Sequence, residues 1–282
     1  MKQIAPRKIL KDVYSKSKKS LLKNSVYAYW WNKKKNFGDI LNPVLYRHFG
    51  MNLVHVNPCD AEILSIGSIL HNLKKCNKFS GYIIGSGLIK DMQLDLRHAK
   101  ILAVRGPLTA ERVSAPDDVI LGDPGLLVSE LLKKRKIKKY ELGIIPHYEE
   151  KAHKSIQQIC EKHRDVVHLI DIQVSPKKFL HEIDQCKYVI SSSLHGLITA
   201  DSLGIPNIRF RTSEKAVGGG DFKYRDYNKT VGRDDDLILL NGSESLDDVT
   251  SQTGINQKEV NLRKAELHAL FGNLKEILIN RE

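Results

Sequence analysis

The feature that most restricts how this chain can fold is an alternation of short apolar runs with stretches of helical pattern. In the first half, runs typical of buried strands lie at residues 27–30, 53–56, 62–68, 81–87 and 101–106. The helix-like stretch GDILNPVLYRHF follows the first of these runs, and PLTAERV follows the last. Apolar strands that alternate with helices indicate parallel sheets covered by helices on both faces. The pattern therefore predicts an α/β fold.

A second series of the same kind occupies the second half of the chain. Strand-like runs lie at residues 141–147, 166–171, 188–193 and 207–210, with helical stretches between them. The charged run LLKKRKIKKY separates the two series, and a helix that ends in charge before a new apolar strand marks a natural boundary. Because a domain takes about 100–200 residues, the 282 residues suffice for two. We predict two doubly wound domains, at residues 1–138 and 139–282.

The last part of the chain is predicted to be one amphipathic helix. The segment NQKEVNLRKAELHALFGNLKEILI places apolar residues at helical spacing, among them Val260, Leu267, Phe271 and Leu274. We expect this helix to pack back across both domains, so that its apolar face is covered.

Positive charge is concentrated in two segments. The chain has 45 Lys and Arg against 33 Asp and Glu, a formal charge of +12. Residues 1–35 hold eleven of the basic residues and one acid, Asp12, and a second basic run lies at 133–139. A nucleic-acid binder would interleave such charges with stacking aromatic residues or place them on a recognition helix, and we find no recognised nucleic-acid motif. The basic N-terminal arm fits either an anionic membrane surface or a solvated charged face.

The sequence gives no sign of a membrane span or a secretion signal. The longest uncharged apolar stretch, residues 188–200, is shorter than the roughly 20 residues that cross a bilayer. The N-terminal residues are charged throughout, without the apolar core of a signal peptide. We therefore expect a cytoplasmic protein.

The cysteines and histidines form no metal-binding pattern. Cys59, Cys76, Cys160 and Cys186 lie far apart without a CxxC pair, so we expect buried, reduced thiols. The eleven histidines include no HExxH motif. No metal site is therefore predicted.

The clearest candidate site follows the strand YVISSS. In α/β sheets, ligands bind beyond the carboxyl ends of strands, where loops enter the next helix. Here Ser191, Ser192 and Ser193 precede His195 and Gly196 at the start of a helix, where free backbone N–H groups favour an anion. His195 can act as a general acid or base near neutral pH. The alternative is that Ser193 only caps the helix and His195 satisfies a buried hydrogen bond.

Other strand ends also carry ionisable side chains. Arg105 follows the strand ILAV, a position that suits a phosphate or carboxylate, although it could equally pair with an acidic neighbour at the domain edge. In NFGDILNP, Gly38 allows close approach of the backbone, and Asp39 lies at a helix N-terminus, where it could be only an N-cap. His147 ends the first strand of the second domain and is expected to face the interdomain crevice, with a core or surface histidine as the alternative.

A further candidate is the segment FRTSEKAVGGGDFKYRDY. Its glycines at 218–220 suggest a flap that brings Lys215 over a bound anion, followed by the basic and aromatic residues Lys223, Tyr224 and Arg225. An exposed turn is the alternative explanation of three consecutive glycines.

Taken together, these motifs resemble the polysaccharide pyruvyl transferase family. The resemblance rests on NFGD, GSG, VRGPLT, LGDPGLL, GIIPH, SSSLHGLITADSLGIP and the SEK…GGDFKYRDY segment, which occur in the family's order and spacing over residues 26–230. The start of the SLHGLI helix and the FKYRDY segment are the most specific of them. The basic N-terminal arm and the final helix lie outside the resemblance.

The resemblance implies two Rossmann-like domains facing a cleft, similar to the GT-B glycosyltransferases. It implies phosphoenolpyruvate as the donor in the cleft and, as the acceptor, a sugar with two hydroxyls that become a pyruvate ketal. The family's catalytic acid/base histidine matches His195, and Arg105 and Lys215 match basic residues that hold the donor's phosphate and carboxylate. The donor site is expected to include four further residues, Ser192, Ser193, Gly196 and His147.

The implied reaction explains why these residue types are needed. Protonation of the enol carbon makes C2 of phosphoenolpyruvate electrophilic, a sugar hydroxyl adds, phosphate departs, and a second hydroxyl closes the ketal. His195 would move the protons, and Arg105 and Lys215 would stabilise the charge that grows on the departing phosphate. Asp39 is expected to position or deprotonate the acceptor hydroxyl. The scheme requires no metal and no cofactor besides the co-substrate.

The sequence thus predicts a cytoplasmic ketal-pyruvyl transferase that acts on a polysaccharide precursor. The precursor is expected to be lipid-linked, and the basic N-terminal arm would meet it at the membrane. The alternative in the same fold is a glycosyltransferase that uses a nucleotide sugar. A non-catalytic nucleic-acid or membrane-binding module is the alternative from a different class, and only the net charge supports it.

Overall fold

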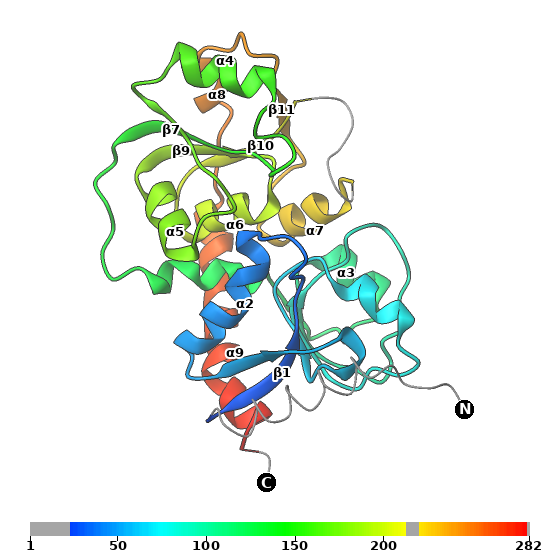
Figure 1. Ribbon diagram of the computed structural model, residues 1–282. Coiled ribbons are helices and arrows are strands. Elements are labelled where there is room, and N and C mark those ends of the chain that lie inside the picture. Colours follow the sequence, from blue (N-terminus) through cyan, green and yellow to red (C-terminus); the bar gives the residue numbers. More distant parts are fainter. Residues whose placement is uncertain (1–22, 213–219, 281–282) are drawn as a thin grey trace.

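The structure is a computed structural model that describes residues 23–212 and 220–280 (Figure 1). The basic residues 1–22 and Lys215 lie outside the described residues. Within the described residues the chain forms two parallel β-sheets, with helices packed against them. The predicted α/β class with two Rossmann-like sheets is confirmed. The domain limits at residues 138 and 139 remain a prediction.

The first sheet contains six parallel strands in the order β2-β1-β3-β4-β5-β6. They are β1 (Ser25–Tyr29), β2 (Asn52–His55), β3 (Ile63–Leu64), β4 (Tyr82–Ser86), β5 (Lys100–Val104) and β6 (Ile120–Leu121). The helices of this half are α2 (Phe37–His48), α3 (Pro107–Arg112) and the 3₁₀ helices η1 (Pro58–Asp60), η2 (Leu70–Lys75) and η3 (Pro124–Leu131). Helix α2 packs into the core because Phe37, Leu41 and Leu45 recur at a spacing of four residues and are fully buried.

The second sheet contains five parallel strands in the order β11-β10-β9-β7-β8. They are β7 (Tyr140–Ile145), β8 (Val167–Leu169), β9 (Cys186–Ser191), β10 (Asn207–Arg211) and β11 (Leu237–Leu239). The helices of this half are α4 (Lys154–Lys162), α5 (Pro176–Asp184), α6 (Leu194–Ser202), α7 (Phe222–Thr230) and α8 (Leu246–Thr250). Central strands are covered on both faces, so Ile144 of β7 and Val189 and Ile190 of β9 are fully buried.

Both sheets have the same strand order. Counted from the first strand of each half, β1 to β5 and β7 to β11 both follow the order 2-1-3-4-5. In such sheets a crevice opens at the carboxyl ends of the two neighbouring strands where the order reverses, and ligands bind there. These strands are β1 and β3 in the first sheet and β7 and β9 in the second. The topology therefore predicts a ligand site at the carboxyl ends of these four strands.

The predicted final helix is α9 (Gln257–Leu278), and it joins the two halves. It follows the second sheet in sequence but contacts η3 and β6 of the first half as well as α6 of the second (Figure 1). The ring of Phe271 lies 5.2 Å from that of Tyr46 in α2 and 5.1 Å from that of Phe49. These contacts extend the first core with residues from the end of the chain. None of the helices in the described part combines the length and apolarity needed to cross a membrane.

One expectation from the sequence is wrong, and one helix was not expected. Cys59 and Cys76 form a disulfide and are not reduced thiols, because η1 and η2 bring their Cα atoms to 5.3 Å, within the span of a disulfide. Cys160 and Cys186 are free thiols, as expected. Lys223 and Tyr224, which follow the glycines, belong to helix α7, an element that was not predicted from the sequence.

Candidate active site

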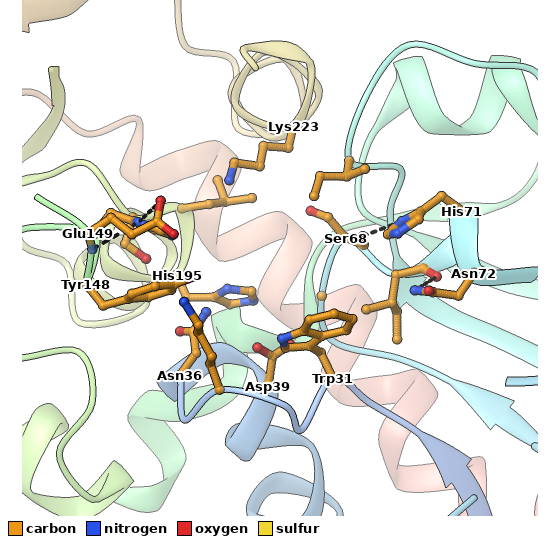
Figure 2. A pocket seen from close by; sticks show the side chains of 17 residues that line it. Trp31, Asn36, Asp39, Ser68, His71, Asn72, Tyr148, Glu149, His195 and Lys223 are labelled. Carbon is orange, nitrogen blue, oxygen red and sulfur yellow. Dashed lines mark hydrogen bonds and ion pairs between the residues drawn. The ribbon is translucent and has the colours of Figure 1, made fainter. Parts of the chain in front are cut away.

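A pocket of about 320 Å³ lies between the two halves (Figure 2). Trp31 and Asp39, on its wall, follow β1, and Ser68 follows β3. His147 follows β7 and His195 follows β9. The pocket therefore coincides with the two places where the strand order reverses. Its other lining residues are Lys34, Asn36, Gly67, Ile69, His71, Asn72, Ile89, Tyr148, Glu149, Ser193, Leu194 and Lys223.

Three helices begin at this pocket. Asn36 is the N-cap residue of α2, Ser193 is the N-cap residue of α6, and Lys223 lies in the first turn of α7. A helix N-terminus carries partial positive charge and N–H groups without intrahelical partners. Three such ends around one pocket, together with the Lys223 side chain, favour an anionic ligand.

The serine-rich end of β9 shapes the start of α6. Ser191 Oγ accepts the N–H of Ser193 at 3.0 Å, and Ser192 Oγ accepts the N–H of His147 at 2.8 Å. Gly196 permits this packing, because a Cβ there would lie 2.2 Å from Ser191 Oγ. Of the predicted donor residues in this segment, Ser193 lines the pocket, whereas Ser192 and Gly196 shape its wall from behind.

His195 is 9% exposed, at the first turn of α6. Its ring packs against Gly38 in α2, where a Cβ would lie 2.1 Å from Nδ1. Its Nε2 lies 3.7 Å from Oδ2 of Asp123. Burial, and then the charges of Arg105 and Lys223, lower the pKa of His195 from 6.5 to about 3. The imidazole is therefore neutral near pH 7.

Asp39 and Lys223 also have displaced pKa values. Asp39 is 8% exposed, and burial raises its pKa to about 7, although the charge of Lys223 opposes the rise. Burial, together with repulsion from Arg105 and Arg209, lowers the pKa of Lys223 to about 8. The pocket thus combines a carboxyl group that is partly protonated near neutrality with a neutral imidazole. Displaced pKa values cluster at functional sites.

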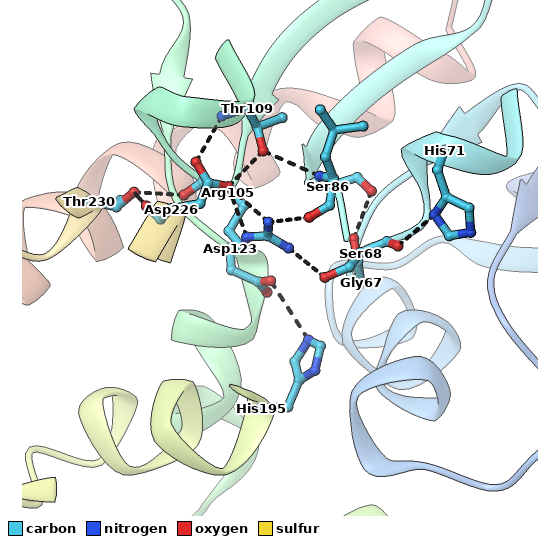
Figure 3. Close-up of polar contacts among 11 residues, drawn as sticks. Gly67, Ser68, His71, Ser86, Arg105, Thr109, Asp123, His195, Asp226 and Thr230 are labelled. Atoms are coloured by element: carbon cyan, nitrogen blue, oxygen red, sulfur yellow. Dashed lines mark hydrogen bonds and ion pairs between the residues drawn. The ribbon is translucent and has the colours of Figure 1, made fainter. Parts of the chain in front are cut away.

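Arg105 lies behind the pocket and is fully buried (Figure 3). Its Nε donates to Oδ2 of Asp226 in α7 at 3.0 Å, and its two terminal nitrogens donate to Ser68 Oγ and to the carbonyl of Leu88, each at 2.6 Å. Arg105 thus pairs with an acidic residue, which was the alternative considered for it from the sequence. Arg105 does not line the pocket and reaches it through Ser68.

His147 also lines the pocket. Burial lowers its pKa, the charge of Lys223 adds to this, and Glu149 opposes it. Lys215, predicted to hold the donor, lies outside the described residues and has no assigned place. In the described part of the chain, no group of three or more His, Cys, Asp or Glu residues is arranged to hold a metal ion.

Several residues at the site were not assigned from the sequence. Ser68 ends the apolar run at residues 62–68, so the rule that ligands bind at strand ends could have found it, whereas Asp123 follows the two-residue strand β6, for which no strand-like run was predicted. Lys223 was visible in the FKYRDY segment, where the buried positions Phe222, Asp226 and Tyr227 have helical spacing. His71 and Asn72 lie in a short 3₁₀ helix, for which the sequence carries no comparable signal.

Residues 7–214 match the model of a family described as polysaccharide pyruvyl transferase. The chain is 29% identical over 211 residues to the succinoglycan biosynthesis protein ExoV of Rhizobium meliloti (strain 1021), a match that covers 72% of this chain and 64% of that protein. It is also 29% identical over 243 residues to the uncharacterized protein L143 of Acanthamoeba polyphaga mimivirus, covering 80% of this chain and 83% of that one.

Among solved structures, the chain resembles the functionally uncharacterized protein KP1_0663 of Klebsiella pneumoniae subsp. pneumoniae NTUH-K2044. The TM-score is 0.41 at 14% identity, over 84% of this chain and all of the other. Because the family model matches well over half of the chain, the protein belongs to the polysaccharide pyruvyl transferase family.

Proposed function

We propose that this protein transfers the pyruvyl group of phosphoenolpyruvate to two hydroxyls of a sugar in a polysaccharide precursor and releases phosphate. The supporting observation is the pocket between the two sheets, where His195, Asp39 and Lys223 lie beside three helix N-termini. Membership of the family is consistent with a pyruvyl donor and a polysaccharide acceptor.

The donor carries a carboxylate and a phosphate, and both are anions. We assign their binding to Lys223 and to the N-terminal N–H groups of α6 and α2, because these groups supply positive charge at the pocket wall. Arg105 and Arg209 add to the positive potential at Lys223, as its lowered pKa indicates. An arriving anion would relieve that repulsion. Lys215 remains a predicted additional ligand from outside the described residues.

The displaced pKa values suggest how the proton transfers are divided. Asp39, with a pKa of about 7, would give its proton to C3 of phosphoenolpyruvate, while neutral His195 accepts the proton of the first attacking hydroxyl. When the second hydroxyl closes the ketal, its proton returns to Asp39, and the proton on His195 leaves with phosphate. Each bound proton is thereby accounted for.

The acceptor side of the pocket is open and aromatic. Trp31 is 36% exposed and Tyr148 lines the same pocket, so we assign these two aromatic side chains to contact with the sugar. The naming of the relative ExoV for succinoglycan biosynthesis suggests an exopolysaccharide precursor as the acceptor here. A lipid-linked acceptor, a cytoplasmic location and contact of the N-terminal arm with a membrane remain proposals, because residues 1–22 lie outside the described part of the chain.

Thermal unfolding with phosphoenolpyruvate tests the donor assignment. A ligand that binds only the native state at 100 times its Kd stabilises that state by about 2.7 kcal/mol, enough to raise the midpoint by several degrees. We expect Lys223→Gln to raise the Kd for phosphoenolpyruvate about 10- to 100-fold, since it removes a charged hydrogen-bond donor. Lys229→Gln is the matched control, because Lys229 is an exposed lysine on the same helix.

Two results would count against the proposal. A midpoint that rises with nucleotide sugars but not with phosphoenolpyruvate would point to glycosyl transfer. Equal weakening in Lys223→Gln and Lys229→Gln would show that the anion does not bind at the pocket wall. Once phosphoenolpyruvate binds, phosphate release that depends on an added saccharide identifies the acceptor.

A further inference from the structure

Asp123 lies at the carboxyl end of the first half's last strand, behind His195. It directly follows the β6 region and is the N-cap residue of η3, where its Oδ1 accepts the N–H of Gly125 at 2.8 Å. The side chain is fully buried. Oδ1 of Asp123 therefore caps the N-terminus of η3.

The second carboxylate oxygen, Oδ2, does not take part in this cap. Among the described residues, Oδ2 of Asp123 has no hydrogen-bond partner, and the same is true of Nε2 of His195. These two buried atoms lie 3.7 Å apart and face each other (Figure 3). Buried polar atoms are nearly always paired, so two opposed unpaired atoms at one site need an explanation. In unliganded enzymes, catalytic hydrogen bonds are often long and shorten when the substrate binds.

The imidazole packs closely against a glycine of α2. A Cβ at Gly38 would lie 2.1 Å from Nδ1, and a Cβ at Gly125 would lie 3.8 Å from Cδ2. The ring is thus packed against α2 at Gly38. Because Nε2 is buried and faces the carboxylate, Nδ1 is the ring nitrogen left to serve a ligand in the pocket that His195 lines.

We propose that Asp123 is a positioning residue that keeps the proton of neutral His195 on Nε2, so that Nδ1 is the bare nitrogen that accepts the acceptor's proton. This proposal rests on the proposed function and adds to it the group that selects the tautomer. The carboxylate accepts from Nε2–H, and it stabilises the imidazolium that forms when Nδ1 takes the hydroxyl proton.

The charges around Asp123 are compatible with this role. Burial raises its pKa to about 6, Asp226 adds to the rise, and the N–H of Gly125 and the charge of Arg105 oppose it. The carboxyl is therefore mainly ionised near pH 7, where His195 is neutral. Near pH 7 the ionised Asp123 carboxylate can therefore accept a hydrogen bond from the neutral His195 ring.

Histidine-selective ¹⁵N NMR measures the tautomer directly. In the wild type at pH 7.5 we expect His195 to show a protonated Nε2 and a bare Nδ1, and the signals are assigned by their absence in His195→Gln. A wild-type ring with its proton on Nδ1 would overturn the proposal. This measurement needs neither an acceptor nor a second variant that folds.

Asp123→Asn provides the second test. The amide oxygen can still accept from Gly125, which leaves the amide NH₂ facing Nε2. A donor at that place forces Nε2 to accept, so the proton is expected to move to Nδ1. Turnover should then fall about 10²- to 10⁴-fold, because the nitrogen facing the pocket is no longer a base. An unchanged tautomer in this variant would contradict the assignment.

Asp184→Asn is the matched control. Asp184 is also fully buried, but it binds Arg135 and does not line the pocket. We expect this variant to keep the wild-type tautomer of His195. The midpoint shift with phosphoenolpyruvate separates the two proposals. If the wild type shows the expected tautomer but phosphoenolpyruvate does not shift its midpoint, only the donor assignment is refuted. If phosphoenolpyruvate shifts the midpoint but the wild type shows the other tautomer, only the role of Asp123 is refuted.

Discussion

Gly38 is the residue whose missing side chain matters most for the site. It lies in the first turn of α2, and a Cβ there would lie 2.1 to 2.5 Å from three ring atoms of His195. In an ordinary helix, Gly→Ala gains about 0.5–1 kcal/mol. Here the added methyl group must displace the buried imidazole.

We therefore expect Gly38→Ala to lower turnover on the order of 10²-fold and to destabilise the protein by about 1–3 kcal/mol. Steady-state kinetics and urea unfolding measure the two effects. Gly272→Ala in α9 is the control, because no atom lies within 4 Å of a Cβ at that position. It should be neutral or slightly stabilising. A stabilised and fully active Gly38→Ala protein would show that the imidazole is not held against α2.

The raised pKa of Asp39 predicts how its removal changes stability with pH. Its pKa is 3.8 when unperturbed and about 7 in the folded protein, so between these values the folded state binds more protons than the unfolded state. The protonated Asp39 side chain therefore contributes its whole stabilisation of the folded state below pH 4, and this contribution declines as the pH rises to 7. Above pH 7 the buried carboxylate lowers the free energy of unfolding by up to about 4 kcal/mol.

Asp39→Asn should therefore be more stable than the wild type at pH 8 and similar to it at pH 4. Urea unfolding at the two pH values measures this difference. The same variant should lose activity, because it cannot protonate the donor. A stability difference that grows toward acid pH would refute the displaced pKa.

At the scale of elements, the disulfide closes the part of the chain that builds one wall of the pocket. Cys59 and Cys76 enclose β3 and η2, and the pocket residues Ser68, His71 and Asn72 lie between them. The bond ties η1 to η2 at the surface. Because it limits how far this segment can move, it also limits how far the wall can move.

Cys59→Ser should lower the free energy of unfolding by about 2–4 kcal/mol, as expected for a loop of this length. It should also weaken binding of phosphoenolpyruvate, since the wall carrying Ser68 and His71 is less constrained. Unfolding and midpoint shifts with and without dithiothreitol measure both effects. Cys160→Ser, which removes a free thiol in α4, is the control. If the reductant affects wild type and Cys59→Ser alike, the disulfide does not stabilise the site.

The elements with a regular pattern could be predicted from the sequence, and the elements fixed by tertiary contacts could not. Strands β1, β4, β7 and β9 are apolar runs bounded by turns, and each was predicted. Helix α7 was missed because the glycines before it suggested a loop, whereas its helical face is set by burial of Asp226 and Tyr227 against both halves. The disulfide was missed because cysteine spacing does not reveal which 3₁₀ helices pack together.

The candidate site shows the same division. His195, Asp39 and His147 were found because each follows a strand or begins a helix, which is a local property. The burial of Arg105 and its pairing with Asp226 could not be inferred, because the two residues are 121 positions apart. Only the packing of α7 against the first half brings them together.

At the scale of the whole molecule, that pair joins the two halves next to the pocket. Asp226 accepts from Arg105 of the first half and from the backbone and hydroxyl of Thr109, at 2.8 and 2.6 Å. On the same helix, Tyr224 donates to the carbonyl of Ser192 at 2.7 Å. Helix α7 is thus bonded to both halves, and it carries Lys223 into the pocket between them (Figure 2).

Asp226→Asn should therefore affect both folding and binding. Removing one partner of a buried ion pair leaves the other charge uncompensated and costs about 3–5 kcal/mol. Because α7 also carries Lys223, binding of phosphoenolpyruvate should weaken even at temperatures where the variant is fully folded. Urea unfolding and titration with phosphoenolpyruvate measure the two effects separately.

Asp95→Asn is the control, because Asp95 pairs with Arg97 on the exposed surface and the loss should leave stability and binding almost unchanged. If Asp226→Asn were destabilised but bound phosphoenolpyruvate normally, the pair would support the fold without setting the position of Lys223. If both properties changed together, the ion pair would couple the packing of the two halves to the geometry of the anion site. The second result is expected, since one helix makes the contacts to both halves and presents the lysine.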